Sequence, residues 1–219
     1  MKVGVLIPFV HDFYLTGILD SIQKNSLLPD VVLLLDNSPD NIVIDISRYS
    51  FTLSWYKSHP PLWVNASWNY GIDKLSVEVD LISVLNDDLV LEKYFFEKLL
   101  KLADKNKNYS VFCPQTVPKL NDLDVPILPD MAYCDRMDRR EGWAWTIRSS
   151  VAKQIPQIPP ELKTWCGDDW MFRHCMKLGR PWAKMINNFC YHYVGGSNVK
   201  MNVRKDLRRE KNIFKELIL

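Results

Sequence analysis

The sequence of 219 residues predicts an α/β fold in which helices flank an open sheet of the nucleotide-binding type. Two continuous apolar runs, at residues 3–7 and 31–35, are typical of strands that are buried on both faces. Between them, residues 14–24 place leucine and isoleucine at the spacing of a helix that packs on a sheet. These segments predict one strand–helix–strand unit within residues 1–38, without the GxGxxG motif of dinucleotide-binding proteins.

The remainder of the chain continues this alternation of strands and helices. Further strands are expected at residues 51–56, 80–85, 111–113, 142–148 and 183–193. Helices are expected to begin near residue 65 and to cover residues 91–103, 149–154, 168–178 and 200–217. Residues 114–141 mix prolines with charges, and they predict a long loop with room for a hairpin.

Composition and charge exclude several classes of protein. Hydrophobic residues make up 47% of the chain, which is the globular range, so long disordered segments are not expected. The net charge of +2 argues against a nucleic-acid binder, and no stretch approaches the roughly 20 apolar residues of a membrane span. The five cysteines include no CxxC pair, which argues against a disulfide scaffold or a zinc ribbon and favours a reducing, cytoplasmic location.

The most informative segment is Asn86-Asp87-Asp88, where an apolar strand ends in one amide and two carboxylates. Such oxygen ligands at the edge of a sheet can hold a divalent cation. On an extended segment Asn86 and Asp88 face the same side, and Asp87 is turned away. The alternative is a loop that supplies capping residues to the next helix.

A second acidic pair, Asp168 and Asp169, stands at the start of a predicted helix. The positive end of the helix dipole favours an ionised carboxylate there, which suits a general base. An acidic helix cap is an equally good interpretation of the position alone. Asp36, at the end of the second strand, could accept hydrogen bonds from a base or a ribose, although a turn aspartate is the more common reason for that placement.

His192 and several tryptophans are further candidates. His192 ends the last predicted strand and could bind a metal through a ring nitrogen, or it could pack as a structural residue between two tyrosines. Trp143, Trp145 and Trp170 flank the candidate site and offer flat faces on which a sugar can stack. The alternative for these tryptophans is ordinary packing in the core.

Taken in order, these segments resemble the motifs of the GT-A glycosyltransferases of the family 2 type. The resemblance covers roughly residues 3–198 and includes a DxD-like segment that ends at Asp88. The other matching segments are the opening strands, Asn65–Gly71, Gly142–Arg148, a Glu-Asp-Trp-like motif at Gly167–Trp170, and an H-x-x-G-x-S motif at His192–Ser197. The resemblance implies a GT-A fold, with a Rossmann-like mixed sheet flanked by helices.

The same resemblance implies an inverting glycosyltransferase that moves one sugar from a nucleoside diphosphate sugar to an acceptor hydroxyl. A UDP-sugar donor, a hexosyl or deoxyhexosyl group and a glycan or glycoprotein acceptor are favoured, with no nucleic acid as partner. The QxxRW motif of processive members is absent, which favours transfer of a single sugar. The compact length is similar to that of short bacterial and large-virus members. We expect one domain over residues 1–219, with a nucleotide-binding half at about 1–90, an acceptor half at about 91–198 and a C-terminal helix at 200–217.

Residue roles follow from the resemblance. The nucleotide would be bound by residues from the first half of the chain, namely Pro8, Asp36, Asn69 and Asp87. Mn²⁺ or Mg²⁺ would be held by Asp88 with help from His192 and Asn86. The general base would be Asp169, with Asp168 as the second choice. The acceptor or its sugar would contact Trp143, Trp145 and Trp170.

Three departures from the family pattern stand in this sequence. Asn86 replaces the first aspartate of DxD, Asp168 replaces the usual glutamate, and Phe9-Val10-His11 replaces the more common Thr-Tyr-Asn. An alternative function is a catalytically inactive module that binds a nucleotide sugar or a carbohydrate, and the intact acidic pairs argue against it. A surface for nucleic acid or membrane on the basic tail at 200–215 is a third hypothesis, for which a solvated helix face is the simpler explanation.

Overall fold

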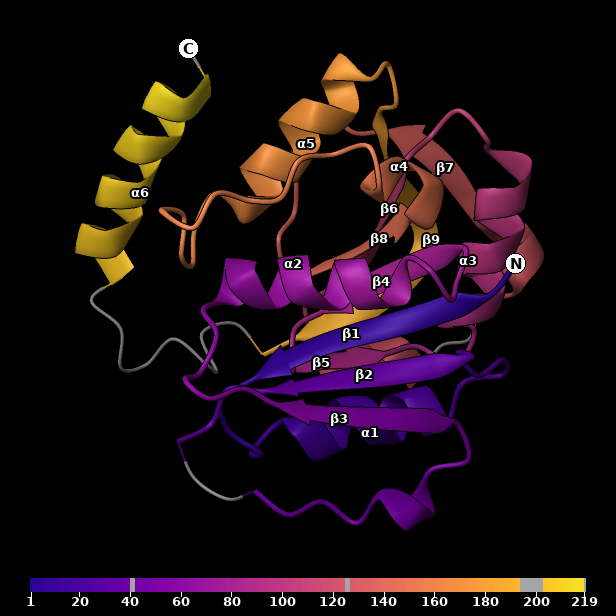
Figure 1. Cartoon of the computed structure of the whole chain (residues 1–219). Helices are drawn as coiled ribbons and strands as arrows, with labels where there is room; N and C mark the ends of the chain where they lie inside the picture. The colour runs from indigo at the N-terminus through magenta and orange to yellow at the C-terminus, as the bar shows by residue number, and fades with distance from the viewer. Residues whose placement is uncertain (40–41, 125–126, 194–202, 219) are drawn as a thin grey trace.

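The computed structural model describes residues 1–39, 42–124, 127–193 and 203–218, and a mixed sheet forms its centre (Figure 1). Within the described residues the sheet has nine strands, in the order β3-β2-β1-β4-β8-β6-β9-β5 with β7 paired to β9. The strands are β1 (Val3–Phe9), β2 (Val31–Asp36), β3 (Thr52–Lys57), β4 (Leu81–Leu85), β5 (Leu89–Leu91), β6 (Val111–Val117), β7 (Tyr133–Arg136), β8 (Ala144–Arg148) and β9 (Trp182–His192).

Helices cover both faces of this sheet. They are α1 (Leu15–Gln23), α2 (Val64–Leu75), α3 (Phe95–Lys105), α4 (Ser149–Ala152), α5 (Gly167–Lys177) and α6 (Val203–Ile218), with short 3₁₀ turns at Ile46–Arg48, Leu120–Asp124 and Pro129–Met131. The predicted α/β architecture is confirmed. β5 differs from the prediction, because it delays the start of the helix predicted at 91–103, and β7 forms within the loop predicted at 114–141 but pairs with β9 instead of forming a local hairpin. Both are short strands that pair with β9, so tertiary pairing rather than local pattern creates them.

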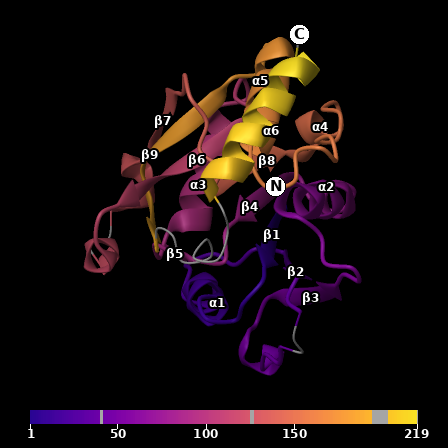
Figure 2. The same cartoon turned by 90° about the vertical axis from the view of Figure 1, so that its left-hand side faces the viewer.

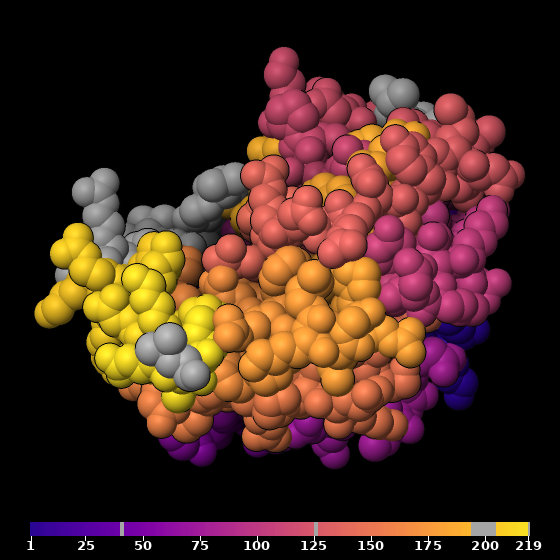
Figure 3. All heavy atoms as spheres, turned by 90° about the horizontal axis from the view of Figure 1, so that it is seen from above, coloured from indigo at the N-terminus to yellow at the C-terminus, as the bar shows by residue number. Residues whose placement is uncertain are grey.

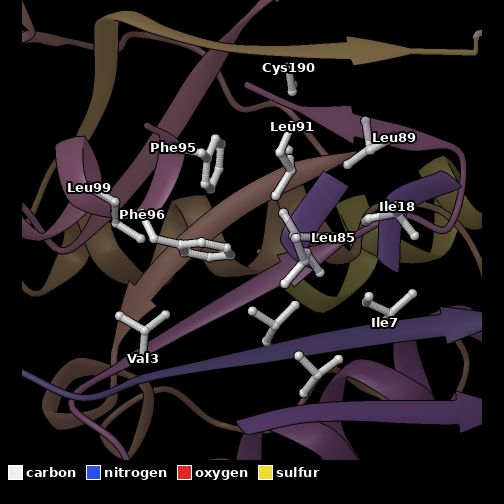
Figure 4. Packing of buried hydrophobic residues seen from close by; sticks show 14 of the residues in the cluster. Val3, Ile7, Ile18, Leu85, Leu89, Leu91, Phe95, Phe96, Leu99 and Cys190 are labelled. Carbon is white, nitrogen blue, oxygen red and sulfur yellow. The ribbon is translucent and has the colours of Figure 1, made fainter. Parts of the chain in front are cut away.

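The two faces of the sheet bury separate hydrophobic cores. Side chains of β1 alternate between them, with Val5 and Ile7 on the side of α1 and α3 and Leu6 on the side of α2 and α5. Figure 4 shows the first core, where Ile7 of β1 and Ile18 of α1 contribute to the packing around the sheet. Both faces are covered at the centre of the sheet, which explains why β1, β2 and β4 are nearly continuous apolar runs in the sequence.

Strand direction decides which chain segments meet at one edge of the sheet. β1 runs parallel to β2 and β4, and β6 runs parallel to β9. β8 runs antiparallel to both β4 and β6, so its first residue, Ala144, pairs with the last residue of β4, Leu85. The carboxyl ends of β1, β2, β4 and β9 therefore lie along the same edge as the start of β8, and open α/β sheets bind ligands at this edge.

A buried ion pair fixes the part of β9 that leads to this edge. Lys98 is fully buried and Glu92 is 3% exposed, and the Lys98 Nζ and Glu92 Oε2 atoms lie 2.6 Å apart. Lys98 also donates to the carbonyl of Asn187 (2.7 Å), and Glu92 accepts from the backbone N–H of Phe189 (2.6 Å). Burial raises the pKa of Glu92, against the opposing effect of Lys98. The pair thus holds an irregular segment of β9, in which Asn187 has a φ of 63°, five residues before His192.

The C-terminal helix α6 packs against the second core and does not extend into solvent (Figure 2). Its partly buried Ile213, Phe214 and Ile218 contact that core, and Arg173 of α5 donates a hydrogen bond to the carbonyl of Ile218 (2.9 Å). No helix in the described part of the chain is long and apolar enough to cross a membrane. The apolar face of the predicted amphipathic tail is thus used for packing within the chain.

We expect Gly71→Ala to destabilise the fold, because α2 approaches β1 closely at Gly71. A Cβ atom at Gly71 would lie 2.3 Å from Cδ1 and 2.9 Å from Cγ of Leu6, which is fully buried. Overpacking of this kind lowers the free energy of unfolding by about 1–3 kcal/mol. Urea unfolding monitored by tryptophan fluorescence measures the loss.

The matched control is Gly17→Ala in α1, where nothing lies within 4 Å of the new Cβ atom. The gain in helix propensity there should leave stability unchanged or raise it by up to about 1 kcal/mol. Equal losses in the two variants would rule out close packing at Gly71 as the cause.

Candidate functional site

The candidate site lies at the carboxyl edge of the sheet, where segments from distant parts of the chain meet. Asn86 follows β4, and its backbone N–H donates to the carbonyl of Trp143 (2.9 Å) just before β8. His192 is the last residue of β9, and it is paired in register with Leu89 of β5. The tight connection from β4 to β5 carries Asp88, so the antiparallel pairing of β5 with β9 brings Asp88 to His192.

Asp88 and His192 are in direct contact. Asp88 is 3% exposed, and its Oδ1 atom lies 3.2 Å from Nε2 of His192. The angles are not those of a hydrogen bond, so Asp88 Oδ1 is a buried oxygen without a hydrogen-bond partner among the described residues. The backbone of Asp88 is held in place, because its carbonyl accepts from the N–H of Tyr193 (3.0 Å).

This contact fits a divalent cation. A buried carboxylate oxygen without a partner costs free energy unless a cation or a donor occupies the adjacent space. Carboxylate oxygen and imidazole nitrogen are ligands of Mn²⁺, and carboxylate oxygen is a ligand of Mg²⁺. In the described residues no group of three or more His, Cys, Asp and Glu side chains could hold a metal ion. Asp88 and His192 could therefore supply only part of the coordination, and ligand oxygens or water would have to supply the rest.

The neighbours of this pair orient it. The ring of Trp143 stacks on the ring of His192, with centroids 5.6 Å apart and planes at 18°. Asn86 is half-buried beside Trp143, and Asp87 is 7% exposed. The structure thus gathers three of the predicted residues, Asn86, Asp88 and His192, at one point, together with the predicted sugar contact Trp143.

The second acidic pair begins α5, and the backbone leading to it is constrained. Cys166 caps the helix in the left-handed region with a φ of 62°, which is uncommon for a residue with a side chain. The next residue is Gly167, where a Cβ atom would lie 2.1 Å from Oδ1 of Asn65. Only glycine allows this approach of α5 to α2. Asp168 and Asp169 follow within the first turn.

Arg140 connects the two carboxylates. Its guanidinium lies 3.8 Å from Oδ2 of Asp168 through Nε and forms an ion pair with Oδ1 of Asp169 through Nη2. Gly142 lies against Asp168, because a Cβ atom there would be 3.3 Å from Oδ2. Burial and the neighbouring charge of Asp169 raise the pKa of Asp168, against the opposing effect of Arg140. Arg140 could not be recognised from the sequence, where its position two residues before Gly142 is the one signal of its role.

Asp36 lies at the predicted edge of the sheet, but its carboxylate already accepts hydrogen bonds from other residues of the chain. It is 1% exposed. Its Oδ1 atom accepts from the N–H and the hydroxyl of Ser38 (2.8 and 2.5 Å), and its Oδ2 atom lies 3.3 Å from both Nζ of Lys57 and Nε1 of Trp55. Burial raises the pKa of Asp36, but the hydrogen bonds from Ser38 and Lys57 outweigh it and the pKa falls below its usual value. Four donors fill the acceptor capacity of a carboxylate, so this oxygen pair offers little to a ligand in this arrangement.

The two other residues expected to bind a nucleotide differ in their surroundings. Pro8 is half-buried near the end of β1, beside Leu35 of β2. Asn69 lies in α2 and makes two hydrogen bonds with the backbone of Ile158, one from Nδ2 to the carbonyl and one from the N–H to Oδ1 (both 2.9 Å). Asn69 therefore holds the loop before α5 onto α2, and its amide is occupied by that contact.

The structure does not agree with the expected sugar contacts of Trp145 and Trp170. Trp145 is fully buried in β8 between Trp68 and Trp182. Trp170 is 8% exposed, and its Nε1 donates to the carbonyl of Pro156 (2.9 Å). Both belong to the second core, so the alternative of ordinary core aromatics applies to them. The Gly195–Ser197 part of the predicted H-x-x-G-x-S motif lies outside the described residues.

Comparisons with known proteins were made on sequence and on structure. The profile described as "Glycosyl transferase family 2" matches residues 5–173. No curated protein matches the chain significantly in sequence. Among solved structures, the S. aureus TarS crystal structure has a TM-score of 0.67 at 15% identity, with 89% of this chain and 37% of that chain covered.

Two further solved structures carry ligands. The complex of S. aureus TarS 1–349 with UDP-GlcNAc has a TM-score of 0.67 at 15% identity, with 92% of this chain and 61% of that chain covered. GalNAc-T7 with UDP, GalNAc and Mn²⁺ has a TM-score of 0.68 at 11% identity, with 88% and 44% covered. The chain thus spans between 37% and 61% of the length of these three structures. The likeness confirms the predicted GT-A fold.

The raised pKa of Asp168 gives a testable dependence of stability on pH. An acid whose pKa is higher in the folded than in the unfolded state destabilises the fold when it is ionised. Asp168→Asn should therefore increase the free energy of unfolding at neutral pH. The gain should shrink as the pH falls through the raised pKa, and it should vanish below about pH 3, where the wild-type carboxyl is protonated in both states.

Urea unfolding of both proteins between about pH 3 and pH 7 measures this difference. Asp138→Asn is the control, because the Asp138 side chain is 95% exposed and lies 3.9 Å from Arg136. A stability difference between wild type and Asp168→Asn that does not change with pH would contradict the assigned cause.

Proposed function

Because the chain belongs to glycosyl transferase family 2, we propose that it transfers one sugar from a nucleoside diphosphate sugar to an acceptor hydroxyl, with inversion at the anomeric carbon. The observation that carries this function is the shared sheet edge. There the carboxylate of Asp88 contacts the imidazole of His192. The loop at 140–143 joins this pair to the second acidic pair, because Trp143 stacks on His192 and Arg140 forms an ion pair with Asp169. One end of the site thus suits a diphosphate that carries a divalent cation, and the other end suits an acceptor.

A UDP-sugar is the proposed donor. TarS was solved with UDP and with UDP-GlcNAc, and GalNAc-T7 was solved with UDP and Mn²⁺, which supports this choice. The nucleoside would lie over the ends of β1 and β2, near Pro8 and Asp36. Since the Asp36 carboxylate already accepts hydrogen bonds within the chain, we infer that it shapes this subsite by holding Ser38 and Lys57.

Mn²⁺ or Mg²⁺ is the proposed cofactor, and Asp88 and His192 are its proposed protein ligands. The unpartnered Oδ1 atom of Asp88, 3.2 Å from the imidazole, supports this assignment. Asn86 and Asp87 would contribute next to this pair. When bound, the cation would supply positive charge that stabilises the departing nucleoside diphosphate.

Asp169 is the proposed general base, with Asp168 as the second choice. The acceptor oxygen would attack the anomeric carbon while the bond from that carbon to the phosphate oxygen breaks, and the base would take the hydroxyl proton. This proposal is supported by the position of both carboxylates in the first turn of α5 and by their contacts with Arg140, which precedes β8. Trp143, beside His192, remains the proposed contact for the sugar.

A second candidate function is binding of a nucleotide sugar without transfer. The observation in its favour is that Arg140 already forms an ion pair with Asp169 and lies 3.8 Å from the carboxylate of Asp168. In this position the guanidinium occupies Oδ1 of Asp169. Proton transfer to that oxygen requires Arg140 to move when an acceptor binds, whereas a binding module would keep the ion pair.

A screen of nucleotide sugars with Mn²⁺, with donor hydrolysis as the readout, should identify a nucleotide sugar that the wild-type protein hydrolyses. With that donor, we expect Asp169→Asn to reduce kcat by about 10²- to 10⁴-fold, the usual contribution of a general base. The dissociation constant for the donor should stay unchanged, because Asp169 lies on the acceptor side. Steady-state kinetics and thermal shift measure the two effects.

Asp168→Asn serves as the matched variant on the neighbouring residue. A large loss of kcat in Asp168→Asn with full activity in Asp169→Asn would transfer the base role to Asp168. Donor binding without any turnover by the wild-type protein would favour the binding module instead. Full activity in both variants would exclude this acidic pair as the base.

A further inference from the structure

The loop that leads into α5 is held from outside by a residue of the C-terminal helix. Glu210 of α6 is 5% exposed, although it stands among the basic residues of the tail. Its Oε2 atom accepts hydrogen bonds from the backbone N–H of Trp165 (2.8 Å) and of Thr164 (3.1 Å), and its Oε1 atom accepts a longer one from the same N–H of Thr164 (3.4 Å). Figure 3 shows α6 in yellow lying against the orange segment that contains this loop and α5.

The opposite side of the same loop is held by α2. Asn65 donates from Nδ2 to the carbonyls of Leu162 (2.9 Å) and Trp165 (3.0 Å), and its backbone N–H donates to the carbonyl of Lys163 (3.0 Å). The loop has no regular structure of its own at these residues. Side chains from two helices therefore provide partners that a strand or helix would otherwise provide.

The clamped loop continues directly into the acidic pair. One residue after Trp165, Cys166 takes the left-handed conformation, and Gly167 then lies against Asn65. Asp168 and Asp169 follow in the first turn of α5. A displacement at Trp165 must therefore change either the left-handed turn or the position of the first turn of α5.

A carboxylate on the packing face of α6 has a cost that apolar residues would not have. Ile213, Phe214 and Ile218 already pack this helix against the core, and burying a charge is unfavourable unless it is hydrogen-bonded. Among the described residues, the hydrogen bonds that the carboxylate of Glu210 accepts come from the N–H groups of Thr164 and Trp165 in the loop. The arrangement favours a role in fixing the loop over a role in attaching the helix.

We propose that Glu210 is a positioning residue for the acidic pair Asp168 and Asp169, and that α6 is therefore a working part of the active site. This inference rests on the proposed transferase function. Glu210 acts through the backbone of Thr164 and Trp165, and it touches neither donor nor acceptor. Removing its oxygens should displace the base and leave the donor side of the site, at Asp88 and His192, in place.

The test compares Glu210→Ala with Glu210→Gln in the full chain. We expect Glu210→Ala to lower kcat by about 10- to 100-fold, which is the cost of a small misplacement of a reacting group, with the KM for the donor unchanged. Glu210→Gln should restore most of kcat, because Oε2 accepts from both N–H groups at the shorter distances and an amide oxygen can replace it, so that only the 3.4 Å contact of Oε1 is lost. If Glu210→Ala does not fold, Glu210→Asp replaces it: a shorter side chain that keeps the charge but loses reach should be less active than Glu210→Gln.

Arg173→Met is the matched control. It removes the hydrogen bond from Arg173 of α5 to the carbonyl of Ile218 in α6, and neither residue belongs to the loop at 162–166. We expect it to lower the melting temperature and leave kcat unchanged. An equal loss of kcat in Arg173→Met, or an unchanged kcat in Glu210→Ala, would overturn the positioning role and leave Glu210 as a structural anchor.

Hydrogen–deuterium exchange separates this inference from the proposed function. Peptides that cover residues 164–169 should exchange faster in Glu210→Ala than in wild type, Glu210→Gln or Arg173→Met. That result would support the positioning of the acidic pair even if the wild-type protein transferred no sugar. Unchanged exchange in this segment would overturn it even if the wild-type protein proved to be an active transferase.

Discussion

The antiparallel pairing of β5 with β9 is the constraint on which the candidate site depends. It joins Leu89 to His192 in register, and it thereby brings a carboxylate from the first half of the chain to an imidazole near the end of the described sheet. β5 has only three residues and could not hold this register alone. The buried Glu92–Lys98 pair supplies the missing support, because it binds the irregular backbone of β9 at Asn187 and Phe189.

The acidic pair at the start of α5 depends on a different kind of support. Its loop is irregular, so hydrogen bonds from Asn65 on one side and Glu210 on the other replace those of regular secondary structure. Gly167 permits the close approach to α2, and Cys166 accepts a left-handed backbone. Strained or tightly packed backbone of this kind is often found at functional sites, where the surrounding structure over-determines it. The donor end of the site is thus built by sheet pairing and the acceptor end by side chains that bind a loop.

Much of the fold could be predicted from the sequence, because buried parallel strands are continuous apolar runs and β1, β2 and β4 follow that rule. Asp88 and His192 were placed together by resemblance to a family, and no local pattern connects them. Burial could not be predicted for Trp145 and Trp170, because the sequence does not show whether a tryptophan side chain lies in the core or at a binding surface. Glu210 and Arg140 were missed because each acts on a segment distant in sequence or irregular in structure, where no periodicity signals a contact.

Calorimetric titration of UDP in the presence and absence of Mn²⁺ most directly tests whether the carboxyl edge is a metal-assisted donor site. We predict that Mn²⁺ strengthens UDP binding to the wild-type protein by about tenfold or more, a typical coupling between two ligands. That gain should be lost in both Asp88→Ala and His192→Ala, while binding without the metal changes little. The same gain from Mn²⁺ in all three proteins would contradict the assignment of Asp88 and His192 as the residues that hold the cation.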